Sequence, residues 1–517
     1  MRVSILHRLI LATLLAAGAA HAELPEPIAA LLQTARIPQE AVGVVVMRGD
    51  ATVVSHNADR SMQPASTMKL FTTMAGLEQL GPIFRGRTEM RSSASVVNGV
   101  LQGDLYLRGG ADADFNEDVL THMLQALRNQ GIKSIKGDVI LDRQLFQPAR
   151  LDVDVPPFDE YPWAYYNVIP DALLVNTNLL KVEMRSTAGS LSVVMMPEME
   201  KVSVDPQMKL ISAPCASWEN GWRTPEAVRK GEKISVVLHG TFPKDCAKSI
   251  SVNVLDRHDY LERLLRATWS RMGGKLSGEV REANAPAAAL PIPSATTATE
   301  AAASAPAPVP ATPPDARLLA DHVSRTLPEI LRDTNKQSDN TLARTIFLSL
   351  GSLEADSALG SHPIAIAPAP GETTSTRADL VIRSWLLRHN INDQGLVLDN
   401  GSGLSRLERA TPGQMAGVLQ AGLKSPWMPE FLSSLPIAAV DGTMRKRLKD
   451  SPAAAHARLK TGSLSGVIAV AGYVPDANGQ SCVVVAFINH EQVANGAGRT
   501  VLDGLIDWVA RSSAPPH

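Results

Sequence analysis

The sequence predicts a mixed α/β (α+β) protein in which the two ends of the chain form one discontinuous domain, with mainly β modules inserted between them. Helix and strand patterns both occur in residues 23–86 and again in residues 256–517. Residues 87–255 instead contain short strand patterns separated by Gly, Pro, Asp and Asn. The 517 residues are enough for roughly two to four domains, and a composition of 44% hydrophobic and 20% charged residues is that of a globular protein.

The first 22 residues have the pattern of a secretory signal peptide. Arg2 and Arg8 form a basic start, residues 9–17 are a short apolar run, and Ala20-His21-Ala22 is a cleavage site. The apolar run is too short to span a bilayer comfortably, although a retained membrane anchor is the alternative. We therefore expect an exported, periplasmic protein with no integral membrane segment after cleavage.

The N-terminal and middle elements follow from local patterns. The N-terminal segment predicts a helix over 26–36, a hairpin of 41–47 with 51–55, and a helix from Ser66 to about Gln79. In the middle of the chain, the clearest strand patterns are 101–107, 191–196 and 234–240.

Helical patterns return in the C-terminal half. Helices are expected over 260–272, 316–332, 341–350, 376–389 and 499–511, and consecutive antiparallel strands over 455–461, 467–474 and 482–488. Residues 283–314 are almost all Ala, Pro, Thr and Ser, a composition that cannot bury a core. We expect them to form a disordered insertion within the discontinuous domain; a tether at a domain boundary is the alternative.

The three cysteines suggest one disulfide bond. Cys215 and Cys246 both lie in a region containing Trp, Pro and Gly, and an oxidising compartment favours a bond between them over two free thiols. Cys482 begins an apolar run that predicts a buried strand, so we expect a core residue there.

Charge and metal-ligand patterns exclude several functions. The net charge of -2 gives no basic surface for nucleic acid and no polybasic membrane patch. The acidic run at 112–118 lacks the glycine and the closing glutamate of a calcium loop, so we interpret 113–118 as a solvated loop. His490-Glu491 begins like a zinc-protease helix, but Ala494 stands where the second His is needed. We expect no metal and no other cofactor.

Ser66 and Lys69 form the only S-x-x-K motif in the chain. Three positions apart on a helix, the two side chains share one face. The start of a helix also offers free N–H groups and the positive end of the helix dipole, which suit a nucleophile that forms an oxyanion beside itself. Alone the motif is weak, because Ser66 could simply cap the helix.

Two more motifs follow in the C-terminal half. Ser338-Asp339-Asn340 lies between two helical patterns, where a hydroxyl and an amide can point into a cleft; a plain helix cap is the alternative. Lys460-Thr461-Gly462, followed by Ser463, supplies a cation and hydroxyls that suit a carboxylate. Gly462 lets a ligand approach the backbone, although an exposed edge-strand Lys beside a turn Gly has the same pattern.

Together the three motifs occur in the order found in penicillin-binding proteins and β-lactamases. The chain resembles the class C low-molecular-mass penicillin-binding proteins, which are D-alanyl-D-alanine carboxypeptidases and endopeptidases. The long interval between Ser66 and Ser338 fits the large insertion of that family. Supporting stretches are Gly137–Asp142, Trp163–Asn167, Asn400–Arg406 and Val440–Thr443.

The resemblance implies a transpeptidase/β-lactamase-like domain of antiparallel sheet flanked by helices, with two inserted mainly-β domains. It makes Ser66 the nucleophile, Lys69 the base, Ser338 the proton shuttle and Asn340 a holder of the substrate amide. Lys460, Thr461, Gly462 and Ser463 would bind the terminal carboxylate. The backbone N–H groups of Ser66 and Ser463 would form the oxyanion hole.

Two further residues are candidates for the side chain of a diaminopimelate peptide. Arg406 would meet its carboxylate and Asp159 its amine, whereas a surface Arg and a solvated loop acid are the alternatives. The expected partners are peptidoglycan peptides and, as covalent inhibitors, β-lactam antibiotics. A β-lactamase and a non-catalytic wall-binding or penicillin-sensing protein are the alternative functions.

Overall fold

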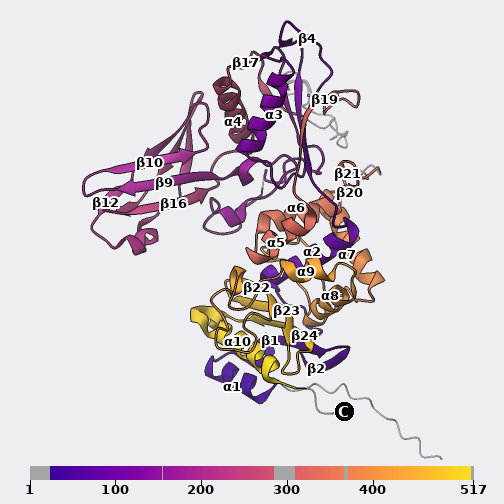
Figure 1. The fold of residues 1–517 in the computed structure, drawn as a ribbon. Coiled ribbons are helices and arrows are strands. Elements are labelled where there is room, and N and C mark those ends of the chain that lie inside the picture. Colours follow the sequence, from indigo (N-terminus) through magenta and orange to yellow (C-terminus); the bar gives the residue numbers. More distant parts are fainter. Residues whose placement is uncertain (1–23, 154, 284–308, 366–368, 370, 514–517) are drawn as a thin grey trace, which may run out of the picture.

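A five-stranded antiparallel sheet contains strands from both ends of the chain (Figure 1). The computed structural model describes residues 24–153, 155–283, 309–365, 369 and 371–513. The strands lie in the order β2-β1-β24-β23-β22. Their bounds are β1 Val42–Arg48, β2 Ala51–His56, β22 Arg458–Leu464, β23 Val467–Pro475 and β24 Ser481–Asn489. The predicted hairpin and the three predicted C-terminal strands are therefore confirmed.

Helices cover both faces of this sheet, and we call the sheet and its helices the terminal unit. On one face, α1 (Glu26–Thr34) packs on α10 (Ala497–Arg511). The other face is covered by α2 Lys69–Gln79, α5 Leu327–Lys336, α6 Asn340–Leu350, α7 Thr374–Arg388, α8 Pro412–Lys424 and α9 Met428–Ser434. Strand β24 is apolar almost throughout because Val483 and Phe487 enter one core and Val484 and Ile488 the other.

A second five-stranded sheet forms the first inserted unit, in the order β18-β8-β6-β3-β19. A smaller sheet, β17-β7-β5-β4, continues it, and helices α3 and α4 pack against each other beside the sheets (Figure 1). The bounds are β3 Arg87–Ser92, β4 Val96–Val97, β5 Val100–Leu101, β6 Leu105–Gly110, α3 Glu117–Asn129, β7 Ser134–Ile135, β8 Val139–Asp142, α4 Arg257–Arg271, β17 Lys275–Leu276, β18 Val280–Glu282 and β19 Arg317–Val323. The predicted helix at 260–272 is α4.

The second inserted unit consists of strands in three small sheets, β10-β9-β16, β11-β14-β13 and β12-β15. Their bounds are β9 Leu180–Ser186, β10 Leu191–Met196, β11 Val202–Pro206, β12 Lys209–Ile211, β13 Glu226–Lys230, β14 Lys233–Leu238, β15 Thr241–Pro243 and β16 Ala247–Val252. The expected disulfide bond between Cys215 and Cys246 is present in this unit. Cys482 is a buried free thiol in β24, as expected.

The predicted domain boundary at residue 255 is too early in the chain. It was expected to divide the inserted residues 87–255 from the returning segment 256–517. Helix α4 and strands β17, β18 and β19 all lie beyond residue 255, yet β18 and β19 pair with β8 and β3. The terminal unit therefore resumes only after β19. The Ala/Pro-rich stretch 283–314, of which 284–308 lie outside the described residues, connects two strands of the first inserted unit and does not interrupt the terminal unit.

The prediction of a helix over 316–332 is wrong. These residues form strand β19 and then the start of α5, with a break between them. Strand β19 lies at the edge of its sheet as described and pairs with β3. Its Leu318 stays 40% exposed while Leu319 is buried next to Ala320, so the sequence lacks the clean alternation of a half-buried strand.

The acidic run at 113–118 is not a solvated loop either. The side chain of Asn116 caps α3 by accepting a hydrogen bond from the backbone N–H of Val119. Glu117 and Asp118 occupy the first turn of the helix, where carboxylates interact favourably with the helix dipole. Asp112 is buried and accepts a hydrogen bond from the hydroxyl of Thr88, at 3.0 Å.

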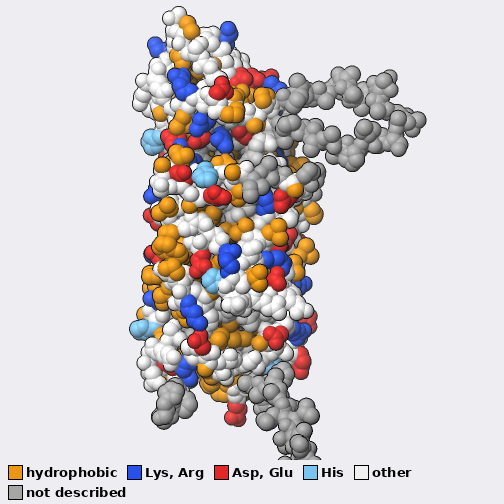
Figure 2. Space-filling view, turned by 90° about the vertical axis from the view of Figure 1, so that its right-hand side faces the viewer, with side chains coloured by type: hydrophobic (Ala, Val, Ile, Leu, Met, Phe, Trp, Pro, Cys, Tyr) orange, Lys and Arg blue, Asp and Glu red, His pale blue; other side chains and the backbone are white. Residues whose placement is uncertain are grey.

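On the face drawn in Figure 2 the molecule is elongated, and basic and acidic side chains are interspersed along it. Residues 1–22, expected to be a signal peptide, lie outside the described residues. Within the described ranges, every helix is either too short or too polar for a membrane span.

Candidate active site

Ser66 and Lys69 meet where a short 3-10 turn, residues Ala65–Met68, leads into α2. The Nζ of Lys69 donates a hydrogen bond to the Oγ of Ser66 at 3.1 Å. It also donates to the Oδ1 of Asn340 at 2.6 Å and to the backbone oxygen of Ser402 at 2.5 Å. Thus Lys69 joins the first two motifs through direct contacts.

Lys69 has no exposed surface, and all three of its hydrogen-bond acceptors are neutral oxygens. Burial penalises the charged ammonium and lowers the pKa of Lys69 to about 7, while the negative charge of Glu408 opposes this shift. A large fraction of the side chain is therefore neutral near pH 7, as a general base must be.

Lys460 and Ser338 form a second pair. The Nζ of Lys460 donates to the Oγ of Ser338 at 2.7 Å and to its neighbour Thr461's backbone oxygen at 2.8 Å. Lys460 is also completely buried, and burial, with a smaller contribution from Lys69, holds its pKa well below the usual value. Ser338 has a φ of 59°, so the backbone turns sharply just before α6.

Edge strand β22 runs directly beside Ser66. A Cβ built on Gly462 would lie 2.9 Å from the backbone nitrogen of Ser66 and 2.8 Å from the oxygen of Pro64, so only glycine allows this approach. The hydroxyl of Thr461 donates to that of Thr443 at 2.8 Å.

A cavity of about 310 Å³ lies along this strand. Its lining includes Thr461, Gly462 and Ser463 together with four basic side chains: Arg445, Lys446, Arg447 and Arg499. Arg447 is paired with Asp503 at 2.6 Å. The remaining positive charge beside the hydroxyls suits an anionic ligand such as a carboxylate.

Glu408 is a part of the site that the sequence did not reveal. This buried carboxylate accepts hydrogen bonds from the backbone N–H groups of Asn400, Gly401 and Gly403, at 3.2, 2.7 and 2.6 Å. It thereby shapes the loop whose Ser402 carbonyl receives Lys69. The stretch Asn400–Arg406 supports the family resemblance, but no local spacing distinguishes Glu408 from a surface acid.

The same loop fits closely against the turn that carries Ser66. Gly403 has a φ of 78°, and a Cβ there would lie 1.9 Å from the backbone oxygen of Ala65. Any other residue at this position would displace the turn.

Asn340 also contacts the long loop that enters the second inserted unit. Its Nδ2 donates to the backbone oxygen of Tyr166 at 2.9 Å. In this loop Asp159 accepts hydrogen bonds from the hydroxyl of Tyr166, the Nδ2 of Asn167 and the backbone N–H of Tyr161, each at 2.8 Å. Asp159 therefore already has three partners within its own loop.

Arg406 lies near the same loop. Its guanidinium donates to the backbone oxygen of Ser465 at 2.9 Å and lies over the ring of Phe158, 6.0 Å from the ring centre. The structure thus brings Ser66, Lys69 and Asn340 into one cluster. Ser338 and Lys460 form a second cluster. The residues that follow Lys460 in β22 are Thr461, Gly462 and Ser463. Among the described residues, the side-chain hydrogen bonds of Arg406 and Asp159 go to neither cluster.

Comparison with known proteins gives a consistent result. The sequence model of the D-Ala-D-Ala carboxypeptidase 3 (S13) family matches residues 24–299 and 304–512. The D-alanyl-D-alanine carboxypeptidase of Actinomadura sp. (strain R39) is 29% identical over 483 residues, which are 90% of this chain and 81% of that protein. The D-alanyl-D-alanine carboxypeptidase DacB of Haemophilus influenzae is 26% identical over 475 residues, 88% of this chain and 86% of that protein.

The crystal structure of penicillin binding protein 4 (dacB) from Haemophilus influenzae has the same fold. It superposes with a TM-score of 0.69 over 93% of this chain and 97% of that chain, at 23% sequence identity. The fold and the enzyme class expected from the three motifs are thereby confirmed. The chain belongs to the D-Ala-D-Ala carboxypeptidase 3 (S13) family and is a penicillin-binding serine peptidase.

Proposed function

We propose that the protein removes the terminal D-alanine from peptidoglycan peptides, and cuts D-Ala cross-links of the same kind, through an acyl-enzyme on Ser66. The observation that carries this proposal is the 3.1 Å contact between the Oγ of Ser66 and the Nζ of a buried Lys69. A hydroxyl needs a neutral base to become a nucleophile, and Lys69 is the titratable group that touches it.

In the first step, the Oγ of Ser66 attacks the carbonyl carbon of the penultimate D-alanine while its proton passes to Lys69. The backbone N–H groups of Ser66 and Ser463 would stabilise the oxyanion; losing one such donor typically raises the barrier by about 2.7–4 kcal/mol. The close approach of β22 at Gly462 supports this assignment.

In the second step, the leaving amine takes a proton as the peptide bond breaks. Ser338, which accepts a hydrogen bond from Lys460, would relay that proton. Asn340 would hold the substrate amide through its side chain. Water then attacks the acyl-enzyme, releases the shortened peptide and restores the hydroxyl of Ser66.

The carboxylate of the terminal D-alanine would bind to Lys460, Thr461, Gly462 and Ser463. The hydroxyls and basic side chains along the 310 Å³ cavity support this role. In an endopeptidase reaction, the same place would have to receive the remainder of a cross-linked peptide.

We further propose that Arg406 and Asp159 contact the side chain of a diaminopimelate peptide. Arg406 is the better placed, because it is exposed and donates to a single backbone oxygen, Ser465. Asp159 would have to share its oxygens with three existing donors. Replacing each with Ala should lower turnover of diaminopimelate peptides relative to lysine peptides; equal turnover of both peptides would remove the two residues from the site.

Penicillins would acylate Ser66 because they resemble the D-Ala-D-Ala end of the peptide. A crystal structure of the Haemophilus influenzae protein is described as complexed with a novel β-lactam, and it superposes on this chain with a TM-score of 0.67 over 93% of the chain. We propose that the protein acts in the periplasm, which the proposed peptidoglycan substrate and the signal-peptide pattern of residues 1–22 support.

The test is mass spectrometry of muropeptides after digestion by the mature protein. We expect loss of terminal D-alanine, loss of cross-links, or both, and none of these with Ser66→Ala. Continued D-alanine release by Ser66→Ala, or its covalent labelling by penicillin, would refute the mechanism. Rapid turnover of penicillin would instead identify a β-lactamase, and stable acylation without peptide cleavage a sensor.

A further inference from the structure

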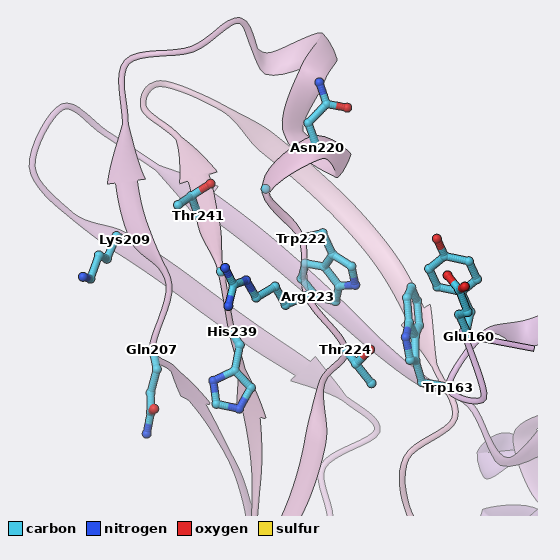
Figure 3. Close-up of a pocket in the computed structure, with 13 residues that line it drawn as sticks. Glu160, Trp163, Gln207, Lys209, Asn220, Trp222, Arg223, Thr224, His239 and Thr241 are labelled. Atoms are coloured by element: carbon cyan, nitrogen blue, oxygen red, sulfur yellow. The ribbon is translucent and has the colours of Figure 1, made fainter. Parts of the chain in front are cut away.

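The second inserted unit contains a cavity of about 1040 Å³ whose lining includes no residue of the terminal unit (Figure 3). Three aromatic residues, Tyr161, Trp163 and Trp222, contribute to its lining. Figure 3 shows Trp163 on one side of the cavity and Lys209 on the opposite side, with Arg223 between them.

The aromatic rings form a continuous series. Trp163 packs edge-on against Tyr161, with ring centres 6.1 Å apart, and against Trp222, at 5.9 Å. The indole nitrogens of Trp163 and Trp222 are buried and have no hydrogen-bond partner among the described residues. These nitrogens face the protein interior, so the aromatic rings themselves are the groups available to a ligand. Aromatic rings bury the apolar C–H faces of sugar rings.

Hydrogen-bonding side chains surround the aromatic series. The lining includes Asn220, Thr224 and Thr241, together with two cations, Lys209 and Arg223. Both cationic side chains are exposed, and in the part of the chain that the structure describes neither forms a side-chain hydrogen bond or an ion pair. Hydroxyl and amide groups match the polar edges of sugars, and free cations match the carboxylates of peptides attached to them.

The cavity is built from closely fitted backbone. The bond between Cys215 and Cys246 anchors the turn that ends at Gly221. A Cβ on Gly221 would lie 2.0 Å from the Oγ1 of Thr241, and one on Gly240 would lie 2.0 Å from the oxygen of Gly221. Such contacts fix the position of Trp222, and a preformed cavity loses little entropy when it binds a ligand.

One loop connects the cavity to the active site. Trp163 lines the cavity, and Tyr166, three residues later, accepts the hydrogen bond from the Nδ2 of Asn340. Three residues of extended chain span at most about 11 Å. The cavity lining at Trp163 therefore lies near the backbone that contacts Asn340, so one polymer can reach both places.

We propose that this cavity binds the glycan strand of peptidoglycan while Ser66 cuts the peptides attached to that strand. The inference rests on the proposed function, since it takes the substrate polymer from it. The aromatic series would hold the sugar rings, and Lys209 and Arg223 would meet carboxylates of the attached peptides.

The test uses two substitutions in the cavity, Arg223→Glu and Trp222→Ala, each in a Ser66→Ala background that cannot digest its target. Binding to insoluble peptidoglycan is measured by co-sedimentation. We expect about tenfold weaker binding for each variant. Lys233→Glu is the matched control, because Lys233 is exposed at the opposite end of β14 from the cavity residue His239.

Peptide-free glycan strands, prepared with an amidase, should compete for binding. Unchanged binding of Arg223→Glu, or competition by peptides but not by peptide-free glycan, would overturn the proposal. In the active background, Arg223→Glu should retain wild-type release of D-alanine from a small soluble peptide while turnover of intact sacculi falls about tenfold. If the wild type itself releases no D-alanine, the proposed function fails, whereas the binding measurement still decides the cavity's ligand.

Discussion

Lys69 and Lys460 are completely buried, and in the part of the chain that the structure describes they donate hydrogen bonds only to neutral oxygens. A buried ammonium without a paired carboxylate is costly, so both sites favour the neutral amine. Lys69 contacts the hydroxyl of Ser66, the proposed nucleophile, and Lys460 contacts the hydroxyl of Ser338, so each amine is placed to exchange a proton with a hydroxyl.

The pKa of Lys69, about 7, predicts how acylation depends on pH. The base must be neutral, so the rate is low when pH is below this pKa and rises to a plateau above it. The measurement is the rate of covalent labelling of Ser66 by a fluorescent penicillin from about pH 5 to about pH 9. A rate independent of pH across this range would show that Lys69 is not the base.

Glu408 should shift that profile. Its negative charge raises the pKa of Lys69, so Glu408→Gln should move the rise in rate to lower pH. A neutral amide is also a weaker acceptor for the three backbone N–H groups, and the resulting displacement of the Ser402 loop should lower the plateau rate by up to about 100-fold. Glu491→Gln, an exposed carboxylate, is the control. A lower plateau with an unshifted profile would assign Glu408 a purely structural role.

At the scale of elements, the contact between β22 and the turn before α2 decides the geometry at Ser66. Gly462→Ala places a methyl group within 2.9 Å of the Ser66 nitrogen and within 2.8 Å of the Pro64 oxygen. One of the two elements must move, and a displacement of about 1 Å at a reacting group can cost about 100-fold in rate. We expect this loss in penicillin acylation.

Gly189→Ala is the control, because a Cβ there meets nothing within 4 Å. It should leave acylation unchanged. Acylation of Gly462→Ala at the wild-type rate would mean that β22 tolerates displacement and that its backbone does not position the nucleophile.

The elements that the sequence predicted well are those whose local pattern matches their surroundings. Strands β23 and β24 are apolar because both faces of their sheet are covered. Strand β19 was mistaken for a helix because an edge strand with an exposed Leu318 carries no clear alternation. The start of α3 was mistaken for a loop because its acidic first turn resembles a solvated segment.

The same reasoning applies to the site. Ser66, Ser338 and Lys460 could be identified because each lies in a short motif with a fixed chain order. The roles of Glu408 and Tyr166 could not, although Tyr166 lies in the supporting stretch Trp163–Asn167, because each acts through contacts with backbone groups or residues distant in sequence. Such contacts depend on tertiary structure and leave no local pattern.

At the scale of the whole molecule, a buried ion cluster holds the loop between the units. Asp171 pairs with Arg143 at 2.6 Å and with Arg257 at 2.8 Å. Arg143 directly follows β8, Arg257 opens α4, and the loop from Asp159 to Asp171 carries Tyr166 to the active site. The cluster therefore links the first inserted unit to the loop that contacts Asn340.

Asp171→Ala would leave two buried guanidinium groups without their shared partner, and we expect a loss of about 3–5 kcal/mol in unfolding free energy. Burial opposes ionisation, but the two arginines hold the pKa of Asp171 below its usual value. A depressed folded pKa gives stability that is present above the unfolded value of about 3.9 and is lost as pH falls through the folded value. Scanning calorimetry at pH 7 and at acidic pH measures both effects. An unchanged transition temperature at pH 7 would contradict the assignment.

Removing the disulfide bond tests the role of the second inserted unit separately from that of the active site. It joins Cys215 and Cys246, 31 residues apart, and closing a loop of that size contributes about 3–4 kcal/mol. Replacing both cysteines with Ser should destabilise this unit and release the turn that holds Trp222, so binding to insoluble peptidoglycan should weaken.

The contacts of Lys69 with Ser66 and Ser402 lie within the terminal unit, so cleavage of a small soluble peptide should persist. Reductant should destabilise the unit and weaken binding to peptidoglycan in the wild type, and it should cause no further change in the double variant. Loss of small-peptide cleavage would instead show that the second inserted unit supports the active site itself.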